Sequence, residues 1–136
     1  IKGNSELNSL NGANGDDTII GSAGNDVYDG AQSSVGDGGG DWVDYSSNNL
    51  VNTISGTLGE GATAGTITDV NGNTHSIFNI ENIKGTAGSD NITGNNDDNT
   101  LLGESGNDTL NGKAGNDKIL VVQVMIPYLV VQVMIS

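Results

Sequence analysis

Single apolar residues recur at every ninth position over two stretches of this chain. They are Leu10, Ile19 and Tyr28 in the first stretch, and Ile92, Leu101, Leu110 and Ile119 in the second. Because side chains alternate across a strand, this pattern predicts short strands in which only the central residue points inward. One apolar residue in nine cannot build a core alone. The pattern therefore predicts a solenoid, in which each strand is covered by a neighbouring copy.

The same stretches divide into nine-residue blocks that open with Gly. The blocks start at Gly3, Gly12 and Gly21, and again at Gly85, Gly94, Gly103 and Gly112. A further block, "GDGGGDWVD" at residues 36–44, is six residues out of phase, as if residues 30–35 were inserted. "SIFNIENIK" keeps the phase, with Glu81 sixth and Ile83 eighth. Gly at the first and fourth places permits the positive φ of a tight turn. Each block is therefore expected to give one turn and one short strand, and two blocks to form one coil.

The sixth place of each block is an acidic or amide residue, in most cases Asp. Turns two blocks apart lie above one another, which brings these side chains and the turn carbonyls close together. The chain carries 17 carboxylates against four Lys, a formal charge of −13, and crowded like charges repel. A hard dication with about six to eight oxygen ligands reverses that repulsion, which favours Ca²⁺. Mg²⁺ demands a tighter octahedron, and Zn²⁺ is disfavoured in a chain with no Cys and one His.

The candidate calcium ligands are of two kinds. The side chains are those of Asp17, Asp26, Asp41, Asp90, Asn99, Asp108 and Asp117. The turn residues are Gly85, Ala87, Asn96, Gly103, Ser105, Gly112 and Ala114. Stacking predicts four pairs: Asp90 with Asp108, Asn99 with Asp117, Asn8 with Asp26 and, if residues 30–35 are an insertion, Asp17 with Asp41. The first pair offers two carboxylates, whereas an amide replaces one of them in the second and third.

The blocks "GSAGNDVYD", "GESGNDTLN" and "GKAGNDKIL" resemble the GGxGxDxUx nonapeptide of the RTX (repeats-in-toxin, haemolysin-type) calcium-binding family. Most blocks replace the second Gly of that motif, at Ala13, Ser22, Thr86, Asn95, Glu104 and Lys113. The resemblance implies an all-β fold, a parallel β-roll that folds on calcium, and type I secretion from a bacterium. "DWVDYS" and "IENIKGTAGSDNITGN" are similar to segments that link RTX blocks in large exoproteins, alginate epimerases and adhesins.

Residues 45–80 lose the period. "LVNTISGTL" and "AGTITDV" alternate apolar and polar residues, and Asn71-Gly72 is typical of a tight hairpin turn. We interpret this segment as antiparallel strands beside or between the roll blocks. His75 is expected on a strand or at the surface, and the pair Asp41 and Asp44 in a turn or at calcium rather than in catalysis. No catalytic residue and no enzyme activity are expected.

Other features restrict the partners. Trp42 stands alone and is expected to pack against the coil instead of binding sugar. The chain lacks the regular row of Thr that an ice-binding face would need. With no basic patch, nucleic acid is a poor partner, and a run that contains Pro127 argues against a membrane span. The expected partners are calcium ions and the other domains of a parent exoprotein.

The heptapeptide "LVVQVMI" occurs twice, at residues 120–126 and 129–135. Read from the third base of each codon, this segment can encode Gly-Gly-x-Gly-Asn-Asp-Thr-Leu-x, so one hypothesis is an RTX array read out of frame. The alternative is a hydrophobic strand pair that caps Leu110 and Ile119, and both can hold. A tail that does not pack would be prone to aggregate.

The expected organisation is a single RTX module over residues 1–136. It comprises a first repeat block (3–44), intervening strands (45–80), a second repeat block (81–120) and a hydrophobic tail (121–136). Its expected function is calcium binding by an extracellular bacterial β-roll that folds after export. Two alternatives stay open. One is an accessory module that binds or orients the substrate, such as a polysaccharide, of an extracellular epimerase, protease or lipase. The other is a spacer repeat of a surface adhesin.

Overall fold

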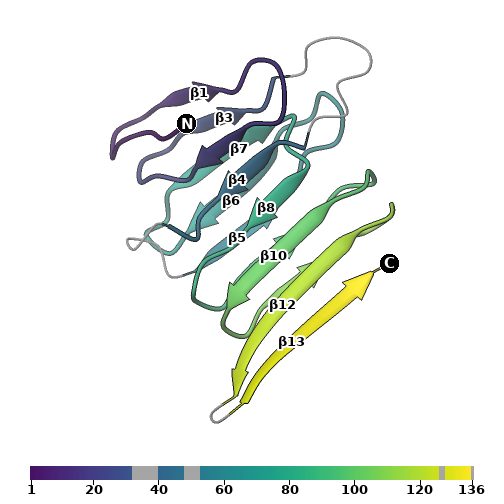
Figure 1. The fold of residues 1–136 in the computed structure, drawn as a ribbon. Helices are drawn as coiled ribbons and strands as arrows, with labels where there is room; N and C mark the ends of the chain where they lie inside the picture. Colours follow the sequence, from purple (N-terminus) through teal and green to yellow (C-terminus); the bar gives the residue numbers. More distant parts are fainter. Residues whose placement is uncertain (32–39, 48–52, 126–127, 136) are drawn as a thin grey trace.

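The computed structural model describes residues 1–31, 40–47, 53–125 and 128–135. Most of the expected insertion at 30–35 and the start of the block at Gly36 lie outside these residues, as do the tail residues 126, 127 and 136. Within the described residues the chain forms strands and no helix (Figure 1). None of them therefore supplies an apolar helix long enough to cross a membrane.

The strands form two sheets that face each other across the core (Figure 1). Sheet A contains, in spatial order, β2 (Thr18–Ile20), β4 (Trp42–Asp44), β8 (Asn82–Lys84), β10 (Thr100–Ser105), β12 (Lys118–Met125) and β13 (Tyr128–Ile135). Sheet B contains β1 (Ser9–Asn11), β3 (Val27–Asp29), β7 (Thr74–Phe78), β6 (Gly65–Asp69), β5 (Ile54–Thr57), β9 (Asn91–Thr93) and β11 (Thr109–Asn111).

Successive nonapeptides alternate between the two sheets, so two of them make one coil. β9 pairs with β11 in parallel, with Ile92 beside Leu110. β10 pairs with β12 in the same way, with Leu101 beside Ile119. Each of these pairs joins equivalent places two repeats apart, and the coil predicted from the nine-residue period is confirmed.

The eighth-place side chains form the core between the sheets. Their buried members are Ile19, Tyr28, Val43, Ile77, Ile83, Ile92, Leu101 and Ile119. Leu10 and Leu110 pack against this core but are only partly buried. They lie in β1 and β11, the two end strands of sheet B, where a neighbour covers one side instead of two.

The intervening segment adds antiparallel strands to one sheet only. In sheet B, β7, β6 and β5 lie between β3 and β9, and both the β6–β7 and the β5–β6 pairs are antiparallel. In sheet A, β8 joins β4 directly to β10. Gly72 turns the chain between β6 and β7 with φ of 82°. The predicted all-β fold, a parallel roll in two blocks with antiparallel strands between them, is confirmed.

The tail extends sheet A by an antiparallel pair. β12 begins as the strand of the last repeat and continues past it, and β13 returns alongside, with Ile119 beside Met134. Figure 1 shows β13 as the outermost strand at the C-terminal end of the roll. Ile119 is 7% exposed. The origin of the tail in a shifted reading frame stays a hypothesis.

Candidate calcium-binding turns

The stacked turns form a ladder through their sixth places. The backbone N–H of Asp90 donates to Asp108 Oδ1 at 2.9 Å, and that of Asn99 donates to Asp117 Oδ1 at 3.0 Å. Each sixth-place side chain thus caps the turn of the coil before it. The structure places together all four pairs that the sequence suggested; whether they bind calcium stays a prediction.

The two pairs of the first block follow the same ladder. The N–H of Asn8 donates to Asp26 Oδ1 at 2.9 Å. The N–H of Asp17 donates to Asp41 Oδ1 at 2.7 Å. The parallel register of β2 with β4 agrees, because Ile19 lies beside Val43.

Glycines at the first and fourth places serve different needs. The fourth-place Gly15, Gly24, Gly106 and Gly115 have φ between 100° and 121°. The first-place glycines that the structure describes are not in the left-handed region, so the expectation that they supply positive φ is wrong there. They supply room instead: a Cβ at Gly12 would approach Asp17 Oδ2 to 2.6 Å.

The second place divides the turns into two kinds. In the first kind, which we call polar turns, a Ser, Thr or Asn at the second place binds the sixth-place side chain. Ser22 Oγ donates to Asp26 Oδ2 at 2.9 Å, and Thr86 Oγ1 donates to Asp90 Oδ1 at 2.9 Å. The N–H of Asn95 donates to Asn99 Oδ1 at 2.8 Å. Polar turns therefore satisfy the sixth-place oxygens with protein donors.

In the second kind, which we call left-handed turns, a non-glycine residue at the second place of an in-phase block has positive φ. These residues are Ala13 (75°), Glu104 (61°) and Lys113 (69°). The Glu104 side chain lies near Lys84, with Oε1 3.5 Å from Nζ, and it makes no bond to Asp108. Among the described residues, Asp17 Oδ2 and Asp108 Oδ2 are buried without a hydrogen-bond partner. Two of the three left-handed turns thus contain an unsatisfied carboxyl oxygen.

The pKa values of the Asp90–Asp108 pair indicate that no positive charge compensates the two carboxylates. Burial raises the pKa of Asp108 to about 6, and the nearby Asp90 charge adds to this effect. The hydrogen bond from the Asp90 N–H lowers the pKa but does not cancel the rise. Burial also raises the pKa of Asp90. Desolvation disfavours ionised carboxyls unless a cation or donors compensate. The pair therefore holds negative charge that the protein alone does not neutralise.

Backbone carbonyl oxygens lie beside both sixth-place pairs of the second block. A Cβ built on Gly85 would lie 3.1 Å from the Gly103 carbonyl oxygen and would also meet Asp90 Oδ2. One built on Gly94 would lie 2.7 Å from the Gly112 carbonyl oxygen. First-place glycines thus leave small spaces lined by a carboxyl or amide oxygen and a carbonyl. The side chains of Ala87, Asn96 and Ala114 are exposed at the rim of these turns, and Ser105 is half-buried.

The donor set fits calcium only if the backbone takes part. In the described ranges no three carboxylate or imidazole side chains converge on one point. Two oxygen-bearing side chains meet at each pair of turns instead, and in the second block turn carbonyls lie beside them at Gly85 and Gly94. Calcium accepts such mixed oxygen sets, whereas a zinc site would need nitrogen or sulfur ligands. The unsatisfied Asp108 oxygen and the space beside Gly85 both agree with an oxygen-bound cation.

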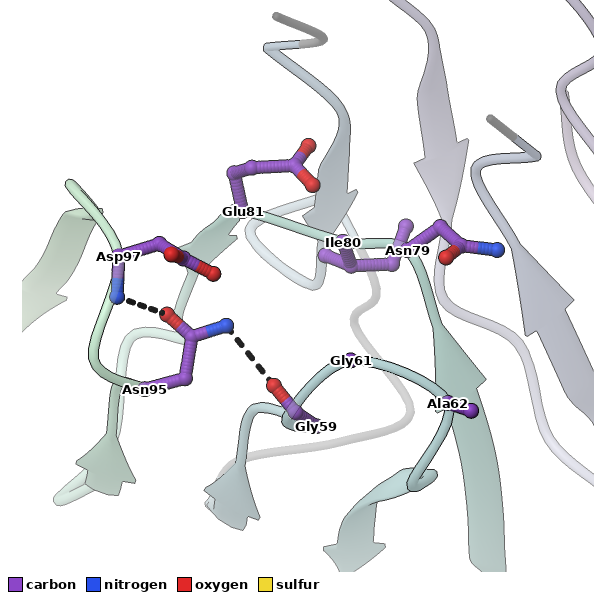
Figure 2. A pocket seen from close by; sticks show the side chains of 8 residues that line it. All are labelled: Gly59, Gly61, Ala62, Asn79, Ile80, Glu81, Asn95 and Asp97. Atoms are coloured by element: carbon purple, nitrogen blue, oxygen red, sulfur yellow. Dashed lines mark hydrogen bonds between the residues drawn. The ribbon is translucent and has the colours of Figure 1, made fainter. Parts of the chain in front are cut away.

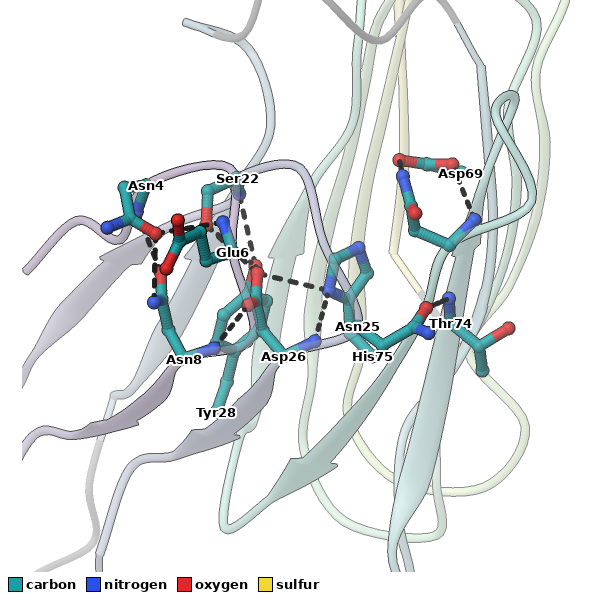
Figure 3. Close-up of polar contacts among 11 residues, drawn as sticks. Asn4, Glu6, Asn8, Ser22, Asn25, Asp26, Tyr28, Asp69, Thr74 and His75 are labelled. Atoms are coloured by element: carbon teal, nitrogen blue, oxygen red, sulfur yellow. Dashed lines mark hydrogen bonds and ion pairs between the residues drawn. The ribbon is translucent and has the colours of Figure 1, made fainter.

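Asp26 contrasts with Asp108 because donors surround it (Figure 3). Its Oδ2 accepts from the Tyr28 hydroxyl at 2.8 Å as well as from Ser22, and it is 1% exposed. His75, completely buried in β7, stacks on Tyr28 with ring centroids 5.2 Å apart. Burial lowers the pKa of His75. A neutral ring fits the bond in which Nδ1 accepts from the Asp26 N–H at 3.3 Å.

Glu81 also enters the ladder, beside a pocket of about 300 Å³ (Figure 2). The N–H of Asp41 donates to Glu81 Oε2 at 3.0 Å. Gly59, Gly61 and Ala62, in the loop between β5 and β6, line one side of this pocket. Asn95 Nδ2 donates to the Gly59 carbonyl there at 2.8 Å. Burial, with a smaller effect from Asp41 and Asp97, raises the pKa of Glu81 to about 7.

Sequence reasoning left His75 and Glu81 out of the site residues. Both occupy sixth places, because each stands two residues before a buried eighth-place Ile, Ile77 or Ile83. In "THSIF" the recognisable signal is a polar residue, His75, placed two residues before an apolar residue, Ile77, in the same strand. His75 was expected at a strand or the surface, and the structure places it on a strand.

Comparison with known proteins agrees with this arrangement. The family model described as RTX calcium-binding nonapeptide repeat (4 copies) matches residues 2–33 and 84–119, which is half of the chain. No curated protein matches the chain significantly. The matched ranges contain all three left-handed turns and omit the antiparallel strands. From its repeats, its coils and this match, the chain belongs to the RTX calcium-binding nonapeptide repeat family, as a calcium-binding β-roll module.

Proposed function

We propose that calcium binds first at the left-handed turns and that this binding drives the module to fold. The supporting observation is the buried Asp108 Oδ2, which has no hydrogen-bond partner among the described residues. An unsatisfied buried acceptor costs about 1–3 kcal/mol, and more when it is charged. A bound cation removes that cost.

The ligands that we propose come from each left-handed turn and the turn stacked on it. Asp108 acts with Asp90 and the Gly103 carbonyl in the second block. Asp117 acts with Asn99 and the Gly112 carbonyl on the other edge. When bound, calcium supplies positive charge and flexible oxygen coordination to groups that otherwise repel.

The first block offers a similar arrangement at Asp17 and Asp41. There the unsatisfied oxygen is Asp17 Oδ2, in the turn whose second place is Ala13. Asp26 is a weaker candidate, because Ser22 and Tyr28 already donate to its Oδ2. We therefore expect calcium affinity to be lower at a turn whose sixth-place oxygens already accept hydrogen bonds from the protein.

The same physics explains why folding would wait for calcium. Seventeen carboxylates against four Lys oppose a compact state, and a single core residue per repeat offers little burial. A ligand that binds only the folded state stabilises it by mass action. In a secreted bacterial protein this dependence keeps the chain unfolded where calcium is scarce and folds it outside the cell.

The test is circular dichroism of the whole chain at neutral pH in calcium, in magnesium, in high sodium chloride and in excess chelator. The proposal expects strand signal in calcium and its loss in the other three. Sodium and magnesium screen charge without matching the coordination that calcium accepts. A chain equally structured in chelator would contradict the proposal, and one rescued by sodium chloride would show general screening instead of site binding.

A further inference from the structure

The two copies of "LVVQVMI" pair with each other inside one chain. The first copy, residues 120–126, lies mostly in β12, and the second, residues 129–135, lies in β13. β12 and β13 run antiparallel. The structure thus shows one heptapeptide that forms a strand pair with an identical heptapeptide.

The register of this pair is symmetric. Val122, third in the first copy, lies beside Val131, third in the second. Leu120 lies beside Val133, and Val124 lies beside Leu129, so first pairs with fifth and fifth with first. A pairing that maps onto itself when the strands are exchanged has the symmetry of a two-fold axis. The heptapeptide is therefore self-complementary.

The other edge of β13 is open in the part of the chain that the structure describes. In an antiparallel pair, every second residue directs its N–H and C=O away from the partner. Natural edge strands block such groups with charges, Pro or bulges. From Ile119 to Ser136 the chain has no charged side chain, and the eight paired residues of β13 show no bulge.

From Val131 to Ile135, both faces of β13 are also exposed. Sheet B ends at β11 and provides no strand opposite β13 within the described ranges. Val131 is 52%, Val133 53%, Met134 53% and Ile135 81% exposed. A strand with an open edge and apolar side chains on both faces is a template for another strand of matching pattern.

We propose that this edge is an interface between two copies of the chain, in which β13 pairs antiparallel with β13 of the second copy. A second copy fits this edge because it carries the same heptapeptide with which β13 already pairs in β12. The same symmetric register places Val131 opposite Val131 of the second copy on a two-fold axis. Such a contact is isologous and closes at a dimer, which joins the two sheets A into one.

Cysteine cross-linking tests the register, because the chain has no Cys of its own. Residues directly opposite on paired strands have Cβ atoms about 4.5–5.5 Å apart. Calcium-saturated Val131→Cys protein should therefore form a disulfide dimer on mild oxidation with diamide. Ile135→Cys is the matched control: position 135 is more exposed, but the register separates its two copies by about eight residues along the strands. The proposal expects Val131→Cys to cross-link at least about tenfold faster than Ile135→Cys.

Sedimentation velocity tests the association itself. Val131→Lys places two like charges opposite each other on the axis and should raise the dimer dissociation constant about tenfold or more. Leu7→Lys adds the same charge at a 77% exposed Leu on the N-terminal turn and should leave the dimer unchanged. Circular dichroism in calcium establishes that each variant is folded. A wild-type chain that stays monomeric, filaments in place of dimers, or faster cross-linking of Ile135→Cys than of Val131→Cys would overturn the proposal.

Discussion

Two turns of the same nonapeptide, residues 21–26 and 103–108, treat their sixth-place Asp in opposite ways. In the first, Ser22 and Tyr28 donate to Asp26 Oδ2. In the second, Glu104 takes a left-handed backbone with φ of 61°, and Asp108 Oδ2 has no partner among the described residues. The second-place residue contributes to this difference, because Ser22 donates to Asp26 whereas the Glu104 side chain lies near Lys84 instead.

Protein donors and cations are thus alternative means of stabilising a stacked carboxylate. Near the intervening strands, His75 and Tyr28 close the site around Asp26 (Figure 3). In the second block no such side chains among the described residues reach Asp108 Oδ2, and the pKa of Asp108 rises to about 6. We infer that the first arrangement stabilises the roll without an ion and that the second needs one.

The largest expected effect comes from removing the donor-satisfied carboxylate. Asp26→Ala leaves the Ser22 and Tyr28 hydroxyls and the Asn8 N–H without their acceptor. We expect the free energy of unfolding in saturating calcium to fall by about 3 kcal/mol, at about 1 kcal/mol or more for each stranded donor. Urea denaturation measures this change. Ser22→Ala, which removes one donor only, should cost about 1 kcal/mol; equal losses for the two variants would contradict the assignment.

Acidification should partly replace calcium at the carboxyls whose pKa is raised in the folded state. The folded-state pKa values of Glu81 and Asp108 rise to about 7 and about 6, so folding takes up protons. The stability that this uptake provides is present in full below the ordinary carboxyl pKa and is lost as the pH rises through about 6 to 7. In chelator, the strand signal in circular dichroism should therefore increase from pH 8 to pH 5. A loss of strand signal on acidification would count against this.

The smallest expected effect concerns the left-handed backbone itself. Ala13 has φ of 75°, a region that disfavours L-residues but not Gly. Ala13→Gly should therefore raise the free energy of unfolding in calcium by about 0.5–1 kcal/mol. Ala23→Gly makes the same chemical change at a third place without positive φ and should lower it by about 0.5–1 kcal/mol. Thermal melts of the pair measure both, and shifts of the same sign would refute the two-turn distinction.

Much of the fold could be predicted from the sequence because one residue per repeat carries the pattern. Ile92, Leu101 and their equivalents follow from the nine-residue period alone, and so does the stacking of Asp90 on Asp108. The two kinds of turn could not be predicted in this way. Their difference depends on φ at Glu104 and on a side-chain bond at Thr86, and both residues merely depart from Gly in the sequence.

The part of the site near the intervening strands was harder to predict for a different reason. His75 follows Asp26 in the ladder across 49 residues of sequence, so no local spacing joins them. The repeat phase places Glu81 at a sixth position, but its neighbour in the ladder follows only from the position of β8 between β4 and β10. Long-range sheet order, rather than repeat chemistry, brings these two residues to the turns.

Titration calorimetry on matched single variants counts the calcium ions bound and so tests whether Asp108, rather than Asp26, holds an ion. Asp108→Asn and Asp26→Asn each remove one negative charge from a sixth place. We predict that Asp108→Asn binds one ion fewer than the wild-type chain and that Asp26→Asn binds the same number. Loss of an ion from Asp26→Asn with none lost from Asp108→Asn would contradict it.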